Sequence, residues 1–163
     1  MRRSEFERFF NDSKDPCFRA LLASVHDAHT ADDLLAESFA RAWAHWRQVR
    51  RHPSPRAWVV RTALNLHRDQ WRTANRPRRS LRTLGPSHDG DPASASRHVD
   101  PLLLAAIASL PERQREVIVH RVLLDLSTEA TAAALGIQPG TVTTHLHRAL
   151  ATLRAALTEG AFR

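Results

Sequence analysis

Arginine side chains crowd into one stretch of the sequence, where their guanidinium groups could bind a polyanion. Residues 41–82 hold twelve arginines and a single acid, Asp69, a balance of +11 within a net charge of +7 for the whole chain. The balance is −3 over residues 1–40 and −1 over residues 83–163. Such a stretch is typical of a protein that binds nucleic acid, although a solvated basic surface in an arginine-rich protein also fits the composition.

A second group of candidate contacts lies between residues 127 and 150. Ser127 can cap a helix that carries the small residues Ala132 and Ala133, the sequence LGI at 135–137 suits a sharp turn, and a further helix follows. Closely crossing helices need small residues at the crossing and a glycine at the turn, so the pattern favours a helix-turn-helix over an ordinary helical hairpin. The candidate groove and phosphate contacts on its second helix are Thr141, Thr143, Thr144, His145 and Arg148.

The elements that position these side chains are all expected to be helices. Apolar residues recur at helical spacing in both halves of the chain, and no alternating, strand-like pattern persists. Between the halves the sequence changes to Pro, Gly, Ser and Asp, which is typical of a linker. We therefore predict an all-α protein with two small helical domains, over residues 1–76 and 102–158, joined by a flexible linker over 77–101.

Several classes of protein are excluded or disfavoured. The first 84 residues contain no glycine, so a glycine-rich nucleotide loop is absent there, and no catalytic triad or paired carboxylates can be recognised. The single cysteine, Cys17, allows no internal disulfide, and the ten histidines show no set of three ligands for a metal. We expect a cytoplasmic protein that is not an enzyme and has no metal, cofactor or membrane span.

The order of these features resembles a bacterial RNA polymerase sigma factor of the extracytoplasmic-function (ECF) type, in its two-domain form. The run LPERQREV at 110–117, followed by LGI at 135–137 and GTV at 140–142, resembles sigma region 4, which reads the −35 promoter element. In the first domain, ADDL at 31–34 with Glu37 and Phe39 resembles region 2.2. The run AWV at 57–59 with Asn65, Asp69 and Arg72 resembles regions 2.3 and 2.4.

The resemblance implies a role for each part of the chain. The helix around residues 32–39 would bind the largest subunit of core RNA polymerase through Asp32, Asp33, Leu34 and Glu37. The basic stretch would hold the −10 element of promoter DNA, with a flipped base captured near the loop at residues 50–56. The residues implied there are Arg50, Arg51, Arg56, Arg61, Asn65, Arg68 and Arg72.

Aromatic residues near the basic stretch could support the extruded base, and the linker gains a role as well. Trp58 and Trp71 are the candidates, although Trp58 lies on an apolar helix face, where packing in the core is favoured. By resemblance the linker would thread near the active-site cleft of the polymerase. Its acids, Asp89, Asp91 and Asp100, either mimic nucleic-acid charge there or only keep a tether solvated.

The chain departs from the family pattern in its second domain, where Thr131 stands at a position that is usually aliphatic. Anti-sigma factors are common regulators in the family, although no residue here identifies one. Two other hypotheses remain open at this point. A dimeric helix-turn-helix regulator that acts without polymerase would use the second domain but leave the basic first domain without a role, and an RNA-binding protein would use only the arginines.

Overall fold

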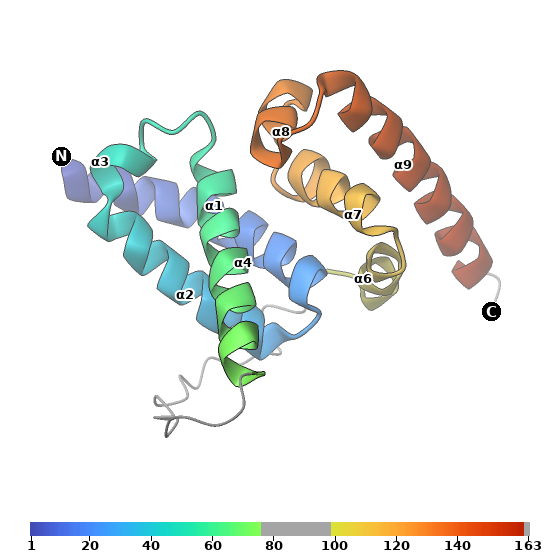
Figure 1. Ribbon diagram of the computed structural model, residues 1–163, viewed down its shortest axis with the longest axis horizontal. Helices are drawn as coiled ribbons and strands as arrows, with labels where there is room; N and C mark the ends of the chain where they lie inside the picture. Colours follow the sequence, from blue (N-terminus) through green and yellow to red (C-terminus); the bar gives the residue numbers. More distant parts are fainter. Residues whose placement is uncertain (76–98, 162–163) are drawn as a thin grey trace.

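The computed structural model describes residues 1–75 and 99–161, and its elements in these ranges are all helical, in two groups (Figure 1). The first group consists of α1 (Arg2–Val25), α2 (Ala28–Ala44), α3 (Trp46–Val49) and α4 (Pro55–Ala74). The second consists of α6 (Pro101–Ala108), α7 (Glu112–Ile118), a π-helical turn η1 (Val119–Leu123), α8 (Thr128–Leu135) and α9 (Pro139–Ala161). The predicted all-α, two-domain fold is confirmed.

Most of the predicted linker, with Asp89 and Asp91, lies outside the described residues. Asp100 is described, and it caps a helix: its carboxylate accepts a hydrogen bond from the N–H of Leu102, and Pro101 occupies the first turn of α6. The second helical group therefore begins one to two residues before the expected boundary at residue 102.

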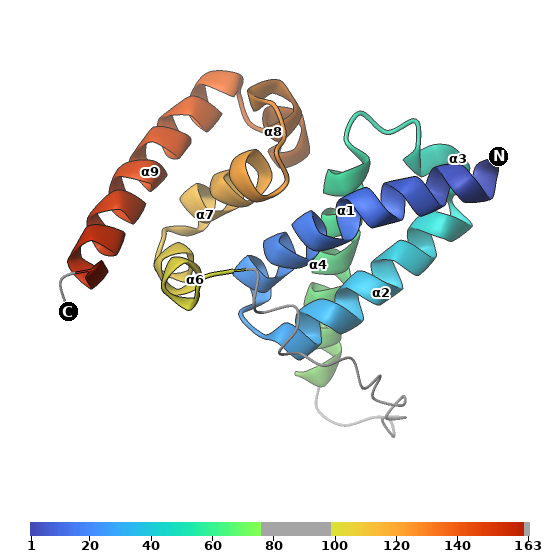
Figure 2. The same cartoon turned by 180° about the vertical axis from the view of Figure 1, so that it is seen from behind.

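Three long helices build the first group, and their ends follow from local chemistry. The left-handed backbone of His26 (φ 60°) ends α1, and the Asp27 carboxylate caps α2 by accepting from the N–H of Thr30 at 2.9 Å. Pro55, which cannot donate to a preceding turn, begins α4. The three helices surround one apolar core (Figure 2).

A proline inside α1 explains how α4 is fixed to it. Pro16 has no N–H, so the carbonyl oxygen of Asp12, four residues earlier, lacks its helical partner. Arg56 replaces that partner: its Nη2 donates to the Asp12 carbonyl at 2.8 Å, and its Nε donates to Oγ of Ser13 at 3.2 Å. One guanidinium thus satisfies the orphaned carbonyl and ties the start of α4 to α1.

The helix-turn-helix forms as the sequence predicts. The hydroxyl of Ser127 accepts from the N–H of Ala130 at 3.0 Å and so caps α8, Gly136 ends α8 with a φ of 66°, and Pro139 begins α9. Before it, α7 passes into η1 at Val119, and Asp125 takes a left-handed conformation (φ 53°) just after η1. Sequence periodicity did not predict this π-helical turn.

The two groups of helices pack against each other, which the sequence also did not predict. Four consecutive residues of α1, Ala20 to Ala23, are at most 6% exposed. Four such positions span about 300° around a helix, so more than one partner must cover them. On one side α2 and α4 contact α1, and on another side α6 and η1 do; one apolar cluster runs through both groups (Figures 1 and 2).

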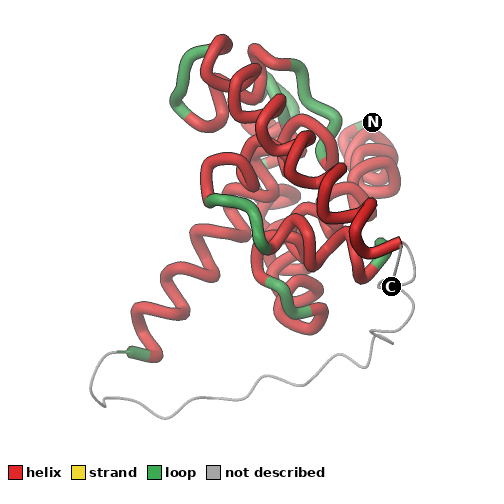
Figure 3. Tube along the Cα trace, turned by 90° about the vertical axis from the view of Figure 1, so that its right-hand side faces the viewer, coloured by secondary structure: helices red, strands yellow, loops and turns green. Residues whose placement is uncertain are grey.

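A separate, smaller cluster holds the helix-turn-helix together. Val117, Ala132 and Val142 form it, with partly buried Leu135, Ile137 and Leu146 packed around them. Figure 3 shows that short loops connect the helices. Among the described helices, none combines the length and the hydropathy needed to cross a membrane.

Candidate nucleic-acid interface

One exposed face of α4 carries half of the arginines predicted to contact the −10 element. Arg61, Asn65, Arg68 and Arg72 follow one another at intervals of four, three and four residues, which places them along a single stripe of the helix. All four side chains are exposed. The stripe spans roughly 16 Å along the helix axis at 1.5 Å per residue. The structure therefore brings four of the predicted residues together on one surface.

The remaining three arginines lie in or just after the loop before α4, and they differ in exposure. Arg50 and Arg51 are exposed, and Nη1 of Arg50 lies 3.2 Å from a carboxylate oxygen of Glu5 in α1. Arg56 is half-buried, and its guanidinium is occupied by the Asp12 carbonyl and by Ser13. The structure thus gives Arg56 a role in fixing α4, which its position in the basic stretch did not reveal.

The two tryptophans predicted to support the extruded base differ in the same way. Trp58 is half-buried and packs against the core of the first domain, as its place on the apolar face predicts. Trp71 is 67% exposed, one residue before Arg72 at the end of the arginine stripe. An exposed indole beside cations can stack on an unpaired base, so Trp71 is the better candidate of the two.

The first turns of α9 present the predicted contacts of the second domain. Thr141, Thr143, Thr144 and Arg148 are exposed. Two of the hydroxyls already donate to the backbone, Thr143 to the Pro139 carbonyl at 3.2 Å and Thr144 to the Gly140 carbonyl at 3.0 Å. The side chain of His145, by contrast, is half-buried. Its Nδ1 is buried and has no hydrogen-bond partner among the described residues, so this side chain faces the packed side of α9 more than the four exposed ones do.

The acidic residues of α2 form a second, distinct surface. Asp33 and Glu37 are exposed, and Glu37 accepts from Nε of Arg41 at 2.9 Å. Asp32 lines a hollow of about 220 Å³ between α1 and α2, beside Phe18 and Leu35. Burial, and then the neighbouring charge of Asp33, raise the pKa of the Asp32 carboxyl. A cationic group from a partner would relieve that repulsion.

Leu34, which the resemblance placed with these acids, is 2% exposed and belongs to the core. Its side chain holds α2 in the bundle and does not reach the surface. The apolar periodicity through Leu34, Leu35 and Phe39 already indicated a core position.

Cys17 and the histidines make no reactive site in the described part of the chain. Cys17 is fully buried, and burial raises the pKa of its thiol to about 12, with Arg56 acting in the opposite direction. Within residues 1–75 and 99–161, no group of three or more His, Cys, Asp or Glu side chains could hold a metal ion.

Two cations that sequence reasoning did not single out lie beside the predicted ones. Arg2 and Arg47 line a hollow with Arg50, between the start of α1 and α3. Arg47 belongs to the basic stretch, and the excess of charge there was the available signal. Arg2 lies 45 residues before Arg47 in the sequence, and only the fold brings the two together.

Comparison with known proteins agrees with this division into two parts. Residues 10–77 match the family described as Sigma-70 region 2, and residues 101–153 match Sigma-70, region 4. The chain is 34% identical over 154 residues to the RNA polymerase sigma-E factor of Streptomyces coelicolor, covering 94% of this chain and 86% of that protein. It is 35% identical over 147 residues to the ECF RNA polymerase sigma factor SigL of Mycobacterium tuberculosis, covering 87% and 82%.

Solved structures share the fold. The sigma factor RpoE of Bartonella quintana, in complex with the anti-sigma factor NepR, matches with a TM-score of 0.69 at 20% identity, over 94% of this chain and 97% of that one. CnrH, in complex with the cytosolic domain of CnrY, matches with a TM-score of 0.60 at 22% identity, over 96% and 90%.

Proposed function

The chain belongs to the ECF group of RNA polymerase sigma factors and directs transcription initiation by RNA polymerase, and from this premise we propose which surface performs each step. The first domain binds core polymerase through the acids of α2 and holds the −10 element along α4. The second domain reads the −35 element through the start of α9. The observation that supports this assignment is that the acidic and the basic candidate residues lie on different helices of one bundle.

The polymerase-binding surface consists of Asp32, Asp33 and Glu37. Their charges are concentrated on one helix, and burial, then the charge of Asp33, raise the pKa of the Asp32 carboxyl, so a further cation beside it would favour its charged form. A basic segment of the polymerase would supply that cation, and complementary charge of this kind favours rapid and specific association. Leu34 contributes only by holding α2 in place.

The −10 surface consists of the stripe Arg61, Asn65, Arg68 and Arg72, extended by Arg50 and Arg51 in the loop. Guanidinium groups at this spacing suit the backbone phosphates of one DNA strand, and Asn65 can form hydrogen bonds with a base. Trp71 offers a stacking surface for an unpaired base at the end of the stripe. Arg56 supports this surface by fixing the start of α4.

The −35 surface consists of Thr141, Thr143, Thr144 and Arg148, with His145 at its edge. The second helix of a helix-turn-helix enters the major groove with its N-terminal residues against the base edges. Arg148 is the one cation among these residues, and it can reach either a phosphate or the O6 and N7 atoms of guanine.

The remaining assignments follow from this role. The chain acts by recognition and catalyses no reaction of its own, and it works in the cytoplasm, where polymerase and DNA are found. Its first domain extends over residues 1–76 and its second from the Asp100 cap of α6 to residue 158, with the linker between them, and an anti-sigma factor is a further partner. A regulator that acts without polymerase is disfavoured, because it would leave the match to region 2 without a function.

Charge reversal and truncation at the two surfaces test the division. Asp33→Arg should weaken co-elution with core polymerase by at least tenfold, since it places a cation where the partner presents one. Glu159→Arg, an equal reversal at an exposed site near the end of α9, should leave it unchanged. Arg148→Ala should lower initiation from promoters with an intact −35 element while core binding persists, and Arg154→Ala on the same helix is its matched control.

Two outcomes would reject the proposal. Loss of core binding by Arg148→Ala, with helix content intact by circular dichroism, would mean that the second domain is not a separate DNA-reading unit. Sequence-specific binding to duplex DNA without any association with core polymerase would instead support the regulator.

A further inference from the structure

A basic hollow lies at the start of α1, outside the surfaces assigned above except for one shared residue. It measures about 290 Å³ and is lined by Met1, Arg2, Glu5, Trp46, Arg47 and Arg50. Three arginines and one glutamate give its side chains a net charge of +2. Its volume is just below the range of pockets that enclose cofactors, so a phosphate group or a single nucleotide unit is the ligand of matching size and charge.

Two of the three arginines are held in position. Nη1 of Arg50 lies 3.2 Å from Glu5, and Nη2 of Arg2 donates to the carbonyl of Trp43 at 3.3 Å. The guanidinium of Arg2 also lies 5.3 Å from the centroid of the Trp43 ring. Side chains that are ordered before a ligand arrives lose less conformational entropy on binding, so these contacts prepare the hollow for an anion.

The indole of Trp46, which lines the hollow, is packed in the core of the first domain. Trp46 is 3% exposed, and its ring centroid lies 5.2 Å from that of Phe6 and 5.1 Å from that of Phe9. The hollow therefore combines three exposed arginines with a well-packed aromatic side chain.

The hollow continues the proposed −10 surface beyond the loop. Arg50 forms part of its wall and also begins the loop that leads to α4. Figures 1 and 2 show the N-terminus of α1 beside α3, with this loop arching from α3 to α4. A DNA strand that follows the stripe on α4 and crosses the loop therefore reaches the hollow next.

We propose that this hollow binds a backbone phosphate of the single-stranded promoter DNA, beyond the nucleotides held by the loop and α4. Arg2 and Arg47 are its DNA-binding residues, and Glu5 positions Arg50. The proposal rests on the proposed function, because it requires that the strand lies along α4. It adds the start of α1 to the DNA-binding surface, a segment that the basic stretch at 41–82 does not include.

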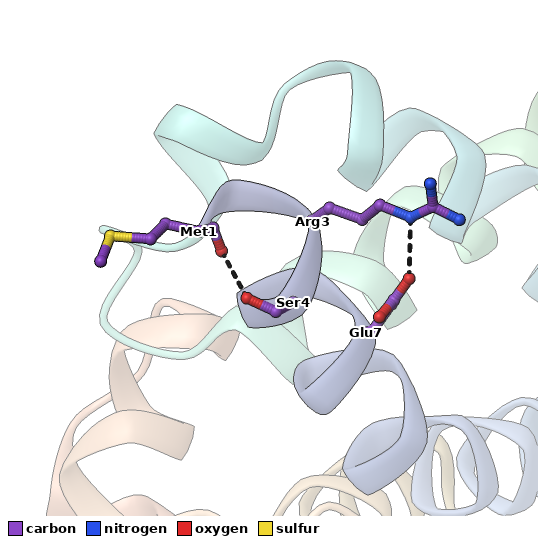
Figure 4. A network of polar contacts seen from close by, with 4 residues as sticks. All are labelled: Met1, Arg3, Ser4 and Glu7. Atoms are coloured by element: carbon purple, nitrogen blue, oxygen red, sulfur yellow. Dashed lines mark hydrogen bonds and ion pairs between the residues drawn. The ribbon is translucent and has the colours of Figure 1, made fainter.

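Neighbouring arginines provide a matched test. Arg2→Gln removes a cation from the hollow, whereas Arg3→Gln removes one whose Nε donates to Glu7 at 2.9 Å on another side of the helix (Figure 4). The full-length protein is assembled with core polymerase on a promoter fragment with a preformed single-stranded bubble, and the half-life of the complex is measured at several salt concentrations. We expect Arg2→Gln and Arg47→Gln each to shorten it about fivefold and to lower the salt slope by about 0.7, the value for one phosphate contact on a single strand. Arg3→Gln should match the unmodified protein.

A second measurement locates the phosphate. Single methylphosphonate linkages, which are uncharged, are placed in turn along the bubble strand, and one position should weaken the unmodified complex but cause no further loss with Arg2→Gln. Equal effects of Arg2→Gln and Arg3→Gln would overturn the proposal. Weakened binding to core polymerase in the absence of DNA would overturn it as well, because the hollow would then bind a protein. Arg68→Gln distinguishes failure of this proposal from failure of the proposed −10 surface. If Arg68→Gln also leaves the half-life unchanged, the assignment of the −10 surface to α4 is wrong.

Discussion

The two domains are built differently: long helices form most of the first domain, whereas most helices of the second are short. Helices of 24, 17 and 20 residues form most of the first domain and share an aromatic-rich core. In the second domain α6, α7 and α8 have only 8, 7 and 8 residues, too short to be stable alone. They depend on packing against α9 and, through α6 and η1, against α1.

Charge is distributed just as unequally. The stripe on α4 carries three exposed arginines, whereas the predicted contacts on α9 include one, Arg148, among hydroxyl groups. On the proposed surfaces, phosphate binding would therefore be concentrated in the first domain, and the second domain would contribute mainly hydrogen bonds. Under this proposal, the first domain supplies most of the binding strength and the second supplies part of the sequence preference.

The largest expected effect is a separation of the two domains. Elements named −35 and −10 are about 25 base pairs apart, which is roughly 85 Å at 3.4 Å per base pair. Domains in contact through α1 and η1 cannot bind both. Exposed Ala44 and Ala151 can be replaced by labelled cysteines, since Cys17 is buried and its thiol pKa is raised to about 12. Energy transfer should be higher in the free protein than in the promoter complex.

Control experiments show whether core polymerase, promoter DNA or both are needed to separate the two domains. Core polymerase alone and promoter DNA alone are each added to the labelled protein, with α-helix content followed in parallel. High transfer that persists in an initiating complex would contradict the assignment of the two elements to the two domains. Low transfer in the free protein would show that the contact between the two groups is too weak to persist in solution.

The next largest effect concerns the unequal charge. Replacing Arg61, Arg68 and Arg72 together by glutamine should weaken binding of the polymerase complex to a bubble promoter by roughly 10- to 100-fold and lower the salt slope by about 2. Arg148→Gln should lower the slope by less than 1 and act most on promoters with an intact −35 element. Fluorescence anisotropy over a salt series measures both. Equal slopes for the two variants would remove the contrast between the domains.

The fold was predictable from sequence where local rules decide it. The helical class, the caps at Ser127 and Gly136 and the helix start at Pro139 all follow from single residues whose backbone preferences are strong. The π-helical turn at 119–123 and the contact of α1 with the second domain depend on tertiary packing, which no window of sequence contains.

The candidate site was predictable to a similar extent. The resemblance to the family named the residues of the stripe on α4, and the helix-turn-helix pattern named those at the start of α9. Neither could show that Arg56 serves the orphaned carbonyl of Asp12, because that partner is 44 residues away in sequence. The same limitation hid the convergence of Arg2 with Arg47.

A smaller effect is expected in the small apolar core of the helix-turn-helix. Thr131 is fully buried, and its Oγ1 has no hydrogen-bond partner among the described residues, which carries a desolvation cost. Thr131→Val keeps the shape and removes the hydroxyl, so it should stabilise the second domain by about 1 kcal/mol. Val142→Thr, which adds a hydroxyl at an equally buried position of the same helix-turn-helix, should destabilise it by a similar amount.

Thermal unfolding can assign these changes to a domain. All four tryptophans lie in the first domain, at positions 43, 46, 58 and 71, so their fluorescence reports that domain and circular dichroism reports the whole chain. Thr131→Val should raise the dichroism midpoint by about 4–8 °C if the second domain unfolds on its own. A shift of the fluorescence transition by the same amount would mean that the two domains unfold as one unit.

The smallest effect concerns His120 in η1, where the second domain meets α1. Its side chain is 7% exposed, and burial lowers the pKa of its imidazole, partly offset by the hydrogen bond between Nδ1 and the Glu116 carbonyl at 2.7 Å. Above the ordinary pKa of 6.5, the folded and unfolded chains both hold a neutral imidazole. As the pH falls below 6.5, the unfolded chain takes up the proton first, so stability decreases toward the lowered pKa. His120→Gln should flatten the decrease in stability that denaturant unfolding measures as the pH falls below 6.5, whereas His147→Gln, at an exposed site, should not. If His120→Gln leaves the dependence of stability on pH unchanged, other groups cause that dependence. His120 would then contribute to the contact between the domains only through packing.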